Sequence, residues 1–86
     1  MVLYKIDIKK SAFKELQSLD KKVIPNIWHH IKNLSENPRP DDSIKLWGSK
    51  SNYRMRIGDY RVIYQIEDHL KTVMVHRIKH RKEVYR

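Results

Sequence analysis

Hydrophobic residues occupy every second position at the beginning of the chain. The apolar series is Val2, Tyr4, Ile6 and Ile8, and the positions between them are mostly polar. A period of two is typical of a β-strand whose two faces differ in burial. We therefore expect a first strand in this segment, with one face more fully buried than the other.

The next two stretches have helical periodicity. Ser11 is a suitable N-cap for a short helix in which Phe13, Leu16 and Leu19 face inward. A second helix is expected to begin around residue 21 or 22 and to end before Pro38. Its apolar stripe follows the i, i+3, i+4, i+7 spacing and consists of Ile24, Ile27, Trp28, Ile31 and Leu34.

A polar loop up to Gly48 separates the helices from three further strands. These are expected at about Asn52–Ile57, Tyr60–Glu67 and Lys71–Arg77. The order β-α-α-β-β-β predicts a single domain over residues 1–86 of the α+β class. Two N-terminal helices should cover one face of a mainly antiparallel, four-stranded sheet and leave the other face open.

The Gly58-Asp59 pair predicts a two-residue hairpin and therefore fixes a register. In that register Arg56 lies opposite Arg61, and both project with Arg54 from the uncovered face. Like charges placed directly opposite cost up to about 1 kcal/mol. One such arginine would be explained as a solvated surface residue. Three on one open face favour an anion site, because guanidinium groups pair well with phosphate oxygens.

The overall charge supports an acidic partner. Nineteen Lys and Arg residues against ten Asp and Glu residues give a net charge of +9. Such a balance favours nucleic acid, although an acidic protein or a membrane surface is also compatible with it. The chain has no cysteine, which excludes disulfides, a thiolate metal site and a cysteine nucleophile. It shows no signal peptide and no membrane-spanning run, so we expect a cytoplasmic protein.

The acidic residues are scattered, and no close acid pair, Ser-His-Asp set or phosphate-binding Gly-rich loop is visible. Chemistry would have to use cations, histidine or tyrosine on a phosphate-bearing substrate, and we expect no metal and no cofactor. The C-terminal segment His76–Arg86 concentrates these residue types. The interpretation that assigns this segment no function is a solvated tail, in which His80 is an ordinary surface histidine and Tyr85 packs its ring.

Three segments together resemble a known family. They are Leu46-Trp47-Gly48, the run from Tyr53 to Tyr64 (YRMRIGDYRVIY), and the closing run from His80 to Tyr85 (HRKEVY). With the chain length and the element order, they resemble the RelE/ParE superfamily of bacterial and archaeal toxins over nearly the whole chain. The closing run favours the RelE branch.

This resemblance implies a compact fold related to small microbial ribonucleases, and a toxin of a type II toxin-antitoxin system. RelE-like toxins act with the ribosome: they cut mRNA in the A site by attack of a 2′-hydroxyl on the adjacent phosphate, which leaves a 2′,3′-cyclic phosphate. The resemblance also implies a RelB-like antitoxin whose acidic segment wraps the toxin.

Position by position, the resemblance assigns roles to the central arginines. Arg54 and Arg56 match two family lysines, and Arg61 matches an arginine that contacts the phosphate. Because an arginine stays protonated, Arg54 and Arg56 are unsuited to act as a general base. They can stabilise the charge that develops on the phosphorane.

The C-terminal matches are Arg81 for a second catalytic arginine, with Lys79 as a competing match, and Tyr85 for a tyrosine that orients the attacking hydroxyl. A proton acceptor is then needed. We expect His80 in this role, with Tyr85 as the alternative, because an ordinary histidine titrates near neutral pH.

Two other function classes remain open. A ParE-like toxin would bind and poison DNA gyrase without being an enzyme, and a catalytically silent module would bind RNA with a steep salt dependence. The sequence offers few exposed aromatic residues for stacking single-stranded bases. We therefore expect the ribosome to supply the substrate geometry.

Overall fold

A five-stranded sheet, a pair of helices and a short third helix make up the described part of the protein. The computed structural model describes residues 3–84, so Val2 of the predicted first strand lies outside the described residues. The elements are β1 Lys5–Ile8, α1 Lys10–Gln17, α2 Ile24–Asn33, β2 Ser43–Lys45, β3 Asn52–Ile57, β4 Tyr60–Glu67, β5 Thr72–His80 and α3 Arg81–Val84. The sheet order is β1-β5-β4-β3-β2. Only the β1–β5 pair is parallel among the four pairs.

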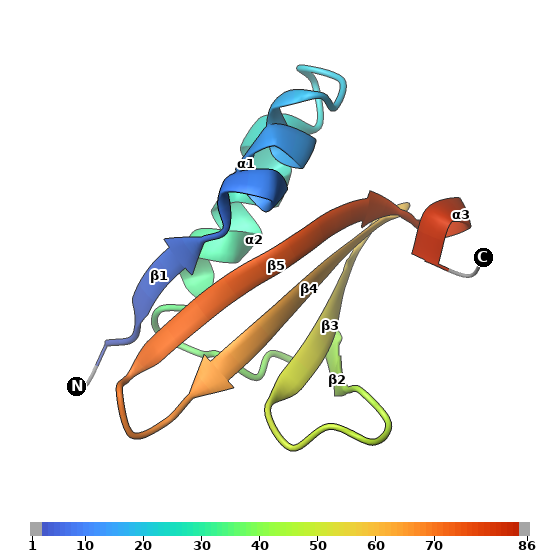
Figure 1. The fold of residues 1–86 in the computed structure, drawn as a ribbon. Coiled ribbons are helices and arrows are strands. Elements are labelled where there is room, and N and C mark those ends of the chain that lie inside the picture. Colours follow the sequence, from blue (N-terminus) through green and yellow to red (C-terminus); the bar gives the residue numbers. More distant parts are fainter. Residues whose placement is uncertain (1–2, 85–86) are drawn as a thin grey trace.

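The predicted α+β architecture is confirmed. Helices α1 and α2 lie on one side of the sheet, and α3 follows the end of β5 (Figure 1). Both strands of the central hairpin have the predicted bounds, and the pairings Ile57–Tyr60 and Arg56–Arg61 are as expected. Gly58 has φ +58°, the left-handed conformation that such a turn needs.

The sheet has a fifth strand that the sequence did not predict. β2 spans three residues and pairs with β3, where Ile44 lies opposite Arg54. Ile44 and Lys45 are exposed, so this strand shows no alternation that could be recognised. Strand β5 runs to His80 and is therefore longer at its C-terminal end than the predicted 71–77.

Helix α1 begins before Ser11, which is not its cap. The Lys9 N–H still donates to the Val75 carbonyl at 2.9 Å, the last sheet bond of this segment. The helix then starts at Lys10 without a side-chain cap. Consequently Ala12 and Leu16 are buried, whereas Phe13, which was expected to face inward, is 46% exposed.

Helix α2 begins at Ile24, with Pro25 in its first turn, and not at residue 21 or 22. Its predicted stripe is largely correct: Ile27, Ile31 and the following Leu34 are buried. Trp28 is the exception, because 39% of its surface is exposed.

The core lies between the two helices and the sheet. Its buried residues are Ala12, Leu16, Ile27, Ile31, Leu34, Tyr53, Met55, Ile57, Val62, Tyr64, Ile66, Val73, Val75 and Ile78. The Tyr64 hydroxyl donates to the Pro38 carbonyl at 2.8 Å. This hydrogen bond attaches the segment between α2 and β2 to strand β4.

A β-bulge in β5 decides which of its side chains face the core. Tyr64 pairs with Val75 but Ile63 pairs with Arg77, so His76 is the extra residue. Without it, Val75 and Ile78 would point to opposite faces, because they are an odd number of residues apart. With it, both are buried, and Arg77 and Lys79 take register positions on the face away from the helices.

An exposed ionic cluster lies at the end of the sheet where β4 turns into β5. Arg39 donates to both carboxylate oxygens of Asp68, the shorter bond being 2.8 Å, and to the Tyr53 hydroxyl. The Tyr4 hydroxyl donates to Asp68 at 2.6 Å. The hydrogen bonds from Arg39 and Tyr4 lower the pKa of Asp68 to about 2 from its ordinary 3.8.

The Asp68 cluster predicts an acid-sensitive contribution to stability. A carboxylate whose pKa is lower in the folded state stabilises the fold above its ordinary pKa and loses that contribution as the pH falls through its folded pKa. We therefore expect Asp68→Asn to lower the urea midpoint at neutral pH. The gap to the wild type should close as the pH falls from 3.8 toward about 2. A gap of equal size at acidic pH would show that the carboxylate charge is irrelevant.

Candidate functional site

A row of three cations crosses the face of the sheet that lies away from the helices. Arg56 of β3 pairs with Arg61 of β4, which in turn pairs with Lys79 of β5. Residues paired across adjacent strands project from the same face. Their neighbours Val62 and Ile78 face the core and are fully buried, which places the cations on the other side. The predicted arginine geometry is thus present, and β5 adds a lysine to it.

The three predicted arginines line one hollow of about 220 Å³. It is bounded by Asp42, Ile44, Arg54, Arg56 and Arg61, which we call the arginine hollow. Asp42 comes to its edge because its carbonyl accepts the Arg56 N–H at 3.0 Å. Three guanidinium groups against one carboxylate leave an excess of positive charge, which attracts anions.

Arg61 is the most unusual member of this group. It is only 6% exposed, although it lies on the open face. Its Nη1 donates to the carbonyls of Gly58 at 3.0 Å and Tyr60 at 2.9 Å, so the side chain folds back over its own turn. Among the described side chains, no carboxylate forms a salt bridge with it. A buried guanidinium held by neutral carbonyls is prepared to bind an anion.

Lys79 is positioned by a carboxylate that the sequence analysis overlooked. Beyond β1 the edge of β5 is unpaired, and Glu15 of α1 covers it by accepting the Ile78 N–H at 3.0 Å. The same carboxylate forms salt bridges with Lys79 and Arg77. Burial raises the Glu15 pKa, but the hydrogen bonds from Lys79 and Ile78 outweigh it, so the net shift is downward. No sequence signal links residues more than sixty positions apart.

His80 does not lie beside the arginines, contrary to our expectation. It pairs with Tyr60 and therefore projects toward the helix-covered side, where its ring makes an edge contact with the Tyr60 ring at 5.4 Å. Its Nδ1 accepts the Lys82 N–H at 3.3 Å. In the neutral ring the proton is then on Nε2. The geometry gives no support to His80 as the proton acceptor.

Arg81 begins α3 and is tied to the hairpin turn. Its N–H donates to the Asp59 carbonyl at 2.7 Å, and its side chain lies 3.8 Å from the Asp59 carboxylate. Of the two competing matches for a second catalytic cation, Lys79 therefore occupies the row of Arg61, whereas Arg81 lies at the end of the strand. Tyr85 lies outside the described residues.

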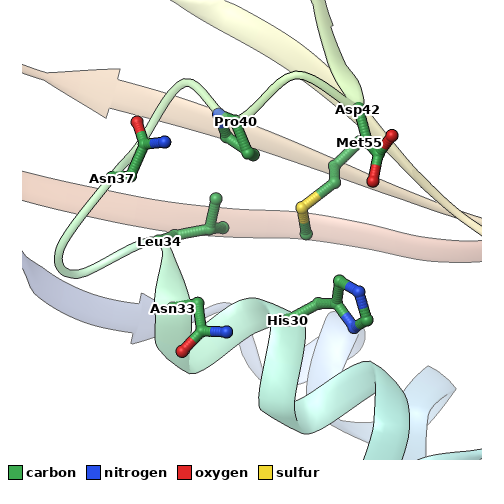
Figure 2. A pocket seen from close by; sticks show the side chains of 7 residues that line it. All are labelled: His30, Asn33, Leu34, Asn37, Pro40, Asp42 and Met55. Atoms are coloured by element: carbon green, nitrogen blue, oxygen red, sulfur yellow. The ribbon is translucent and has the colours of Figure 1, made fainter.

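A second hollow lies on the helix side, at the same edge of the sheet. It has a volume of about 250 Å³, and Figure 2 shows Leu34, Pro40 and Met55 gathered between α2 and the segment that leads to β2. Its polar rim includes His30, whose Nδ1 donates to the Asn26 carbonyl at 2.8 Å. Asp42 lines this hollow as well as the arginine hollow.

The sequence and fold of this chain match a known protein family. The sequence profile described as "ParE toxin of type II toxin-antitoxin system, parDE" matches residues 6–85. The chain belongs to the RelE/ParE toxin superfamily. The resemblance seen in the sequence motifs is therefore confirmed.

Individual relatives of this RelE/ParE toxin carry the RelE name. A putative RelE-like toxin protein of Escherichia coli is 30% identical over 86 residues, covering 95% of this chain and 90% of that protein. The archaeal RelE–RelB complex from Pyrococcus horikoshii contains a chain that is 35% identical, with a TM-score of 0.83 and coverage of 93% and 97%. The complex RelBE2 from Mycobacterium tuberculosis contains one that is 26% identical, with a TM-score of 0.82 and coverage of 94% of each chain.

The family assignment agrees with the rest of the structure. The RelE/ParE toxin is a toxin of the type II toxin-antitoxin class, and its helices and mixed sheet match those of the RelE chains. Within residues 3–84, no helix is long and apolar enough to cross a membrane.

Proposed function

We propose that this toxin is an endoribonuclease that cuts mRNA in the ribosomal A site and so inhibits translation. The observation that carries the proposal is the row of Arg56, Arg61 and Lys79 across the open face. A buried Arg61 at its centre offers one phosphate several charge-assisted hydrogen bonds.

The reaction needs stabilisation of the charge on the phosphorane, which this set of cations supplies, and a proton acceptor for the 2′-hydroxyl. The 2′-oxygen of one nucleotide attacks the adjacent phosphorus, and the bond to the following 5′-oxygen breaks. The products are a 2′,3′-cyclic phosphate and a 5′-hydroxyl, so one proton leaves the 2′-hydroxyl and one is added to the 5′-oxygen. Because His80 pairs with Tyr60 on the other face of the sheet, Tyr85 is the proposed acceptor of the first proton. Arg61 stabilises the charge on the equatorial oxygens, helped by Arg54, Arg56 and Lys79. Arg81 and Tyr85 complete the proposed site, with Tyr85 orienting the attacking hydroxyl.

The partners in this proposal are the translating ribosome, its mRNA and a cognate RelB-like antitoxin. The solved relatives include complexes of RelE with RelB, and a net charge of +9 suits an acidic antitoxin segment. Such a segment would relieve the repulsion between Arg56 and Arg61. Action on ribosomes places the toxin in the cytoplasm.

The direct test is to map mRNA ends after adding the toxin to translating ribosomes. The proposal expects cuts confined to the A-site codon, with cyclic phosphate ends, and little cutting of naked RNA because the ribosome supplies the substrate geometry. Intact mRNA together with DNA breaks in cells would instead identify a ParE-like poison of DNA gyrase. Salt-sensitive RNA binding without any cut would indicate a silent binding module.

His80→Gln is expected to leave the single-turnover rate on ribosomes within about threefold of wild type, well short of the loss typical for a general base. The reason is that His80 faces Tyr60 and its Nδ1 already accepts the Lys82 N–H. A loss of about 10²-fold or more, with ribosome binding retained, would restore His80 as the proton acceptor.

A further inference from the structure

Three hydrogen-bonded polar side chains lie on the open face of the sheet, beyond the row of three cations. His76 Nε2 and Gln65 Oε1 are 3.1 Å apart, and Gln65 Nε2 donates to Glu67 Oε1 at 2.5 Å. Gln65 and Glu67 are two positions apart on β4, and Ile66 between them is buried in the core. Both side chains therefore project from the face away from the helices. We call these three residues the amide–imidazole chain.

The β-bulge of β5 supplies the histidine of this chain. His76 is the extra residue of the bulge, and its bond to Gln65 shows that it lies on the open face. In a regular strand His76 and Arg77 would point to opposite faces, whereas here both belong to the open one. Bulges are frequent beside functional sites, where they change the direction of a side chain. The disrupted ladder thus places an imidazole on the same face as the cations.

The hydrogen bonds fix the role of each atom in the chain. Because Gln65 Nε2 donates to Glu67, its Oε1 faces His76 and accepts the Nε2 proton. Burial lowers the pKa of His76, and the charge of Lys9 adds to this shift, so the ring is neutral at pH 7 and its Nδ1 is an acceptor. Gln65 keeps one lone pair and one N–H for a ligand. The chain therefore offers two acceptors and one donor.

An apolar position separates the cations from this chain. Ile63 lies between Arg61 and Gln65 on the same face of β4, and Arg54 pairs with it across β3. Four residues of strand separate Arg61 from Gln65, which is about 13 Å. Cations, an aliphatic contact and hydrogen-bonding groups follow in the order of the phosphate, the sugar and the base edge of RNA. Open sheet faces read single-stranded RNA in this way.

We propose that Gln65 and His76 bind the edge of one base of the A-site codon and select a base with an exocyclic amino group over uracil. The amino group would donate to Gln65 Oε1 and His76 Nδ1, and the spare Gln65 N–H would donate to an acceptor of the same base. Uracil has two carbonyl oxygens and a single N–H, so one oxygen would face an acceptor. Glu67 is a positioning residue, because it acts by orienting Gln65. The inference rests on the proposed function and adds its base specificity.

The first measurement is the single-turnover rate on ribosomes whose mRNAs differ at one A-site position at a time. At one of these positions, uracil should slow the wild type about tenfold relative to adenine or cytosine. Gln65→Met and His76→Phe should abolish this preference and leave the other positions unchanged. Gln17→Met makes the same chemical change at an exposed position of α1, and it should retain the wild-type preference.

The role of Glu67 has its own pair of variants. Glu67→Ala removes the acceptor that orients the Gln65 amide and should weaken the base preference. Glu67→Gln retains an acceptor oxygen and should restore it. Equal preference in Glu67→Ala and the wild type would remove Glu67 from the proposal.

Binding to the free protein separates this inference from the proposed function. Short oligouridines with methylated 2′-oxygens cannot be cut, and low salt strengthens their phosphate contacts. Replacing one uridine with adenosine should tighten binding about tenfold, and Gln65→Met should remove this gain without changing the affinity for oligouridine. This result would support base selection even if the toxin cut no mRNA on ribosomes.

If the toxin cuts mRNA on ribosomes, the codon series decides the proposal, and otherwise the oligonucleotides decide it. Equal rates or affinities for all bases would overturn it, and so would a preference that survives Gln65→Met and His76→Phe. An equal loss on every codon in these variants would show that the amide–imidazole chain only supports the sheet. Circular dichroism and urea unfolding would establish that each variant is folded under the conditions used.

Discussion

Replacing Arg61 with lysine is expected to lower the single-turnover rate of mRNA cleavage on ribosomes by about 10²–10³-fold, the usual cost of losing one preorganised donor to a developing oxyanion. Lysine keeps the charge but not the planar fork. In the wild type, Nη1 is held by the carbonyls of Gly58 and Tyr60, which fixes the direction of the remaining N–H groups. A flexible ammonium cannot reproduce that arrangement.

Arg56→Lys is the matched control for this experiment. Arg56 pairs directly with Arg61 but is exposed, so the same substitution should cost less than about tenfold, as expected for a solvated charge. Arg61→Lys should also lose about 1 kcal/mol of stability through its turn hydrogen bonds, so both rates must be measured where the variants are fully folded. Equal rates for the wild type and Arg61→Lys, or equal losses in the two variants, would contradict the assigned role of Arg61.

Glu15→Ala is expected to lower the free energy of unfolding by about 1–3 kcal/mol, the range for leaving a donor without its partner in a partly buried site. The carboxylate is the acceptor of the Ile78 N–H and the ionic partner of Lys79 and Arg77. Its removal uncovers the edge of β5 beyond β1, and an uncovered edge strand also invites pairing with other chains. Urea unfolding measures the loss, and light scattering measures the association.

Two further variants separate charge from hydrogen bonding at this edge. Glu15→Gln retains an acceptor for the Ile78 N–H and should recover part of the stability lost in Glu15→Ala. Asp7→Asn removes a partly exposed carboxylate that lies 3.8 Å from Lys5, and it should cost less than about 0.5 kcal/mol. If Glu15→Ala lowered the free energy of unfolding no more than Asp7→Asn does, the contact of Glu15 with the edge of β5 would not contribute to stability.

Much of the architecture could be predicted because local chemistry specifies it. The Gly58-Asp59 pair fixed the hairpin register, and this register alone placed Arg54, Arg56 and Arg61 on one face, as the structure confirms. The predictions failed where a local pattern was weak or misleading. β2 is too short to show a period of two. Ser11 is not the cap of α1, because the Lys9 N–H is still bonded to the Val75 carbonyl and the helix begins at Lys10.

The family was also readable from the sequence, since the central run from Tyr53 to Tyr64 and the closing run from His80 to Tyr85 carry it. The exposure of the aromatic residues on the two helices could not be predicted from the sequence. Phe13 and Trp28 fit a helical stripe as well as any core residue does, and periodicity cannot tell a face that meets the sheet from one that borders a groove.

The sequence by itself determined the order of the elements, the central hairpin and its three arginines, because turn chemistry and side-chain alternation act over a few residues. Only the tertiary structure decided the rest of the site. The bulge at His76 reversed the alternation in β5, which brought Lys79 beside Arg61 and turned His80 away. Glu15 reached Lys79 across more than sixty residues. Strand pairing and packing create such contacts between distant segments, and no local pattern records them.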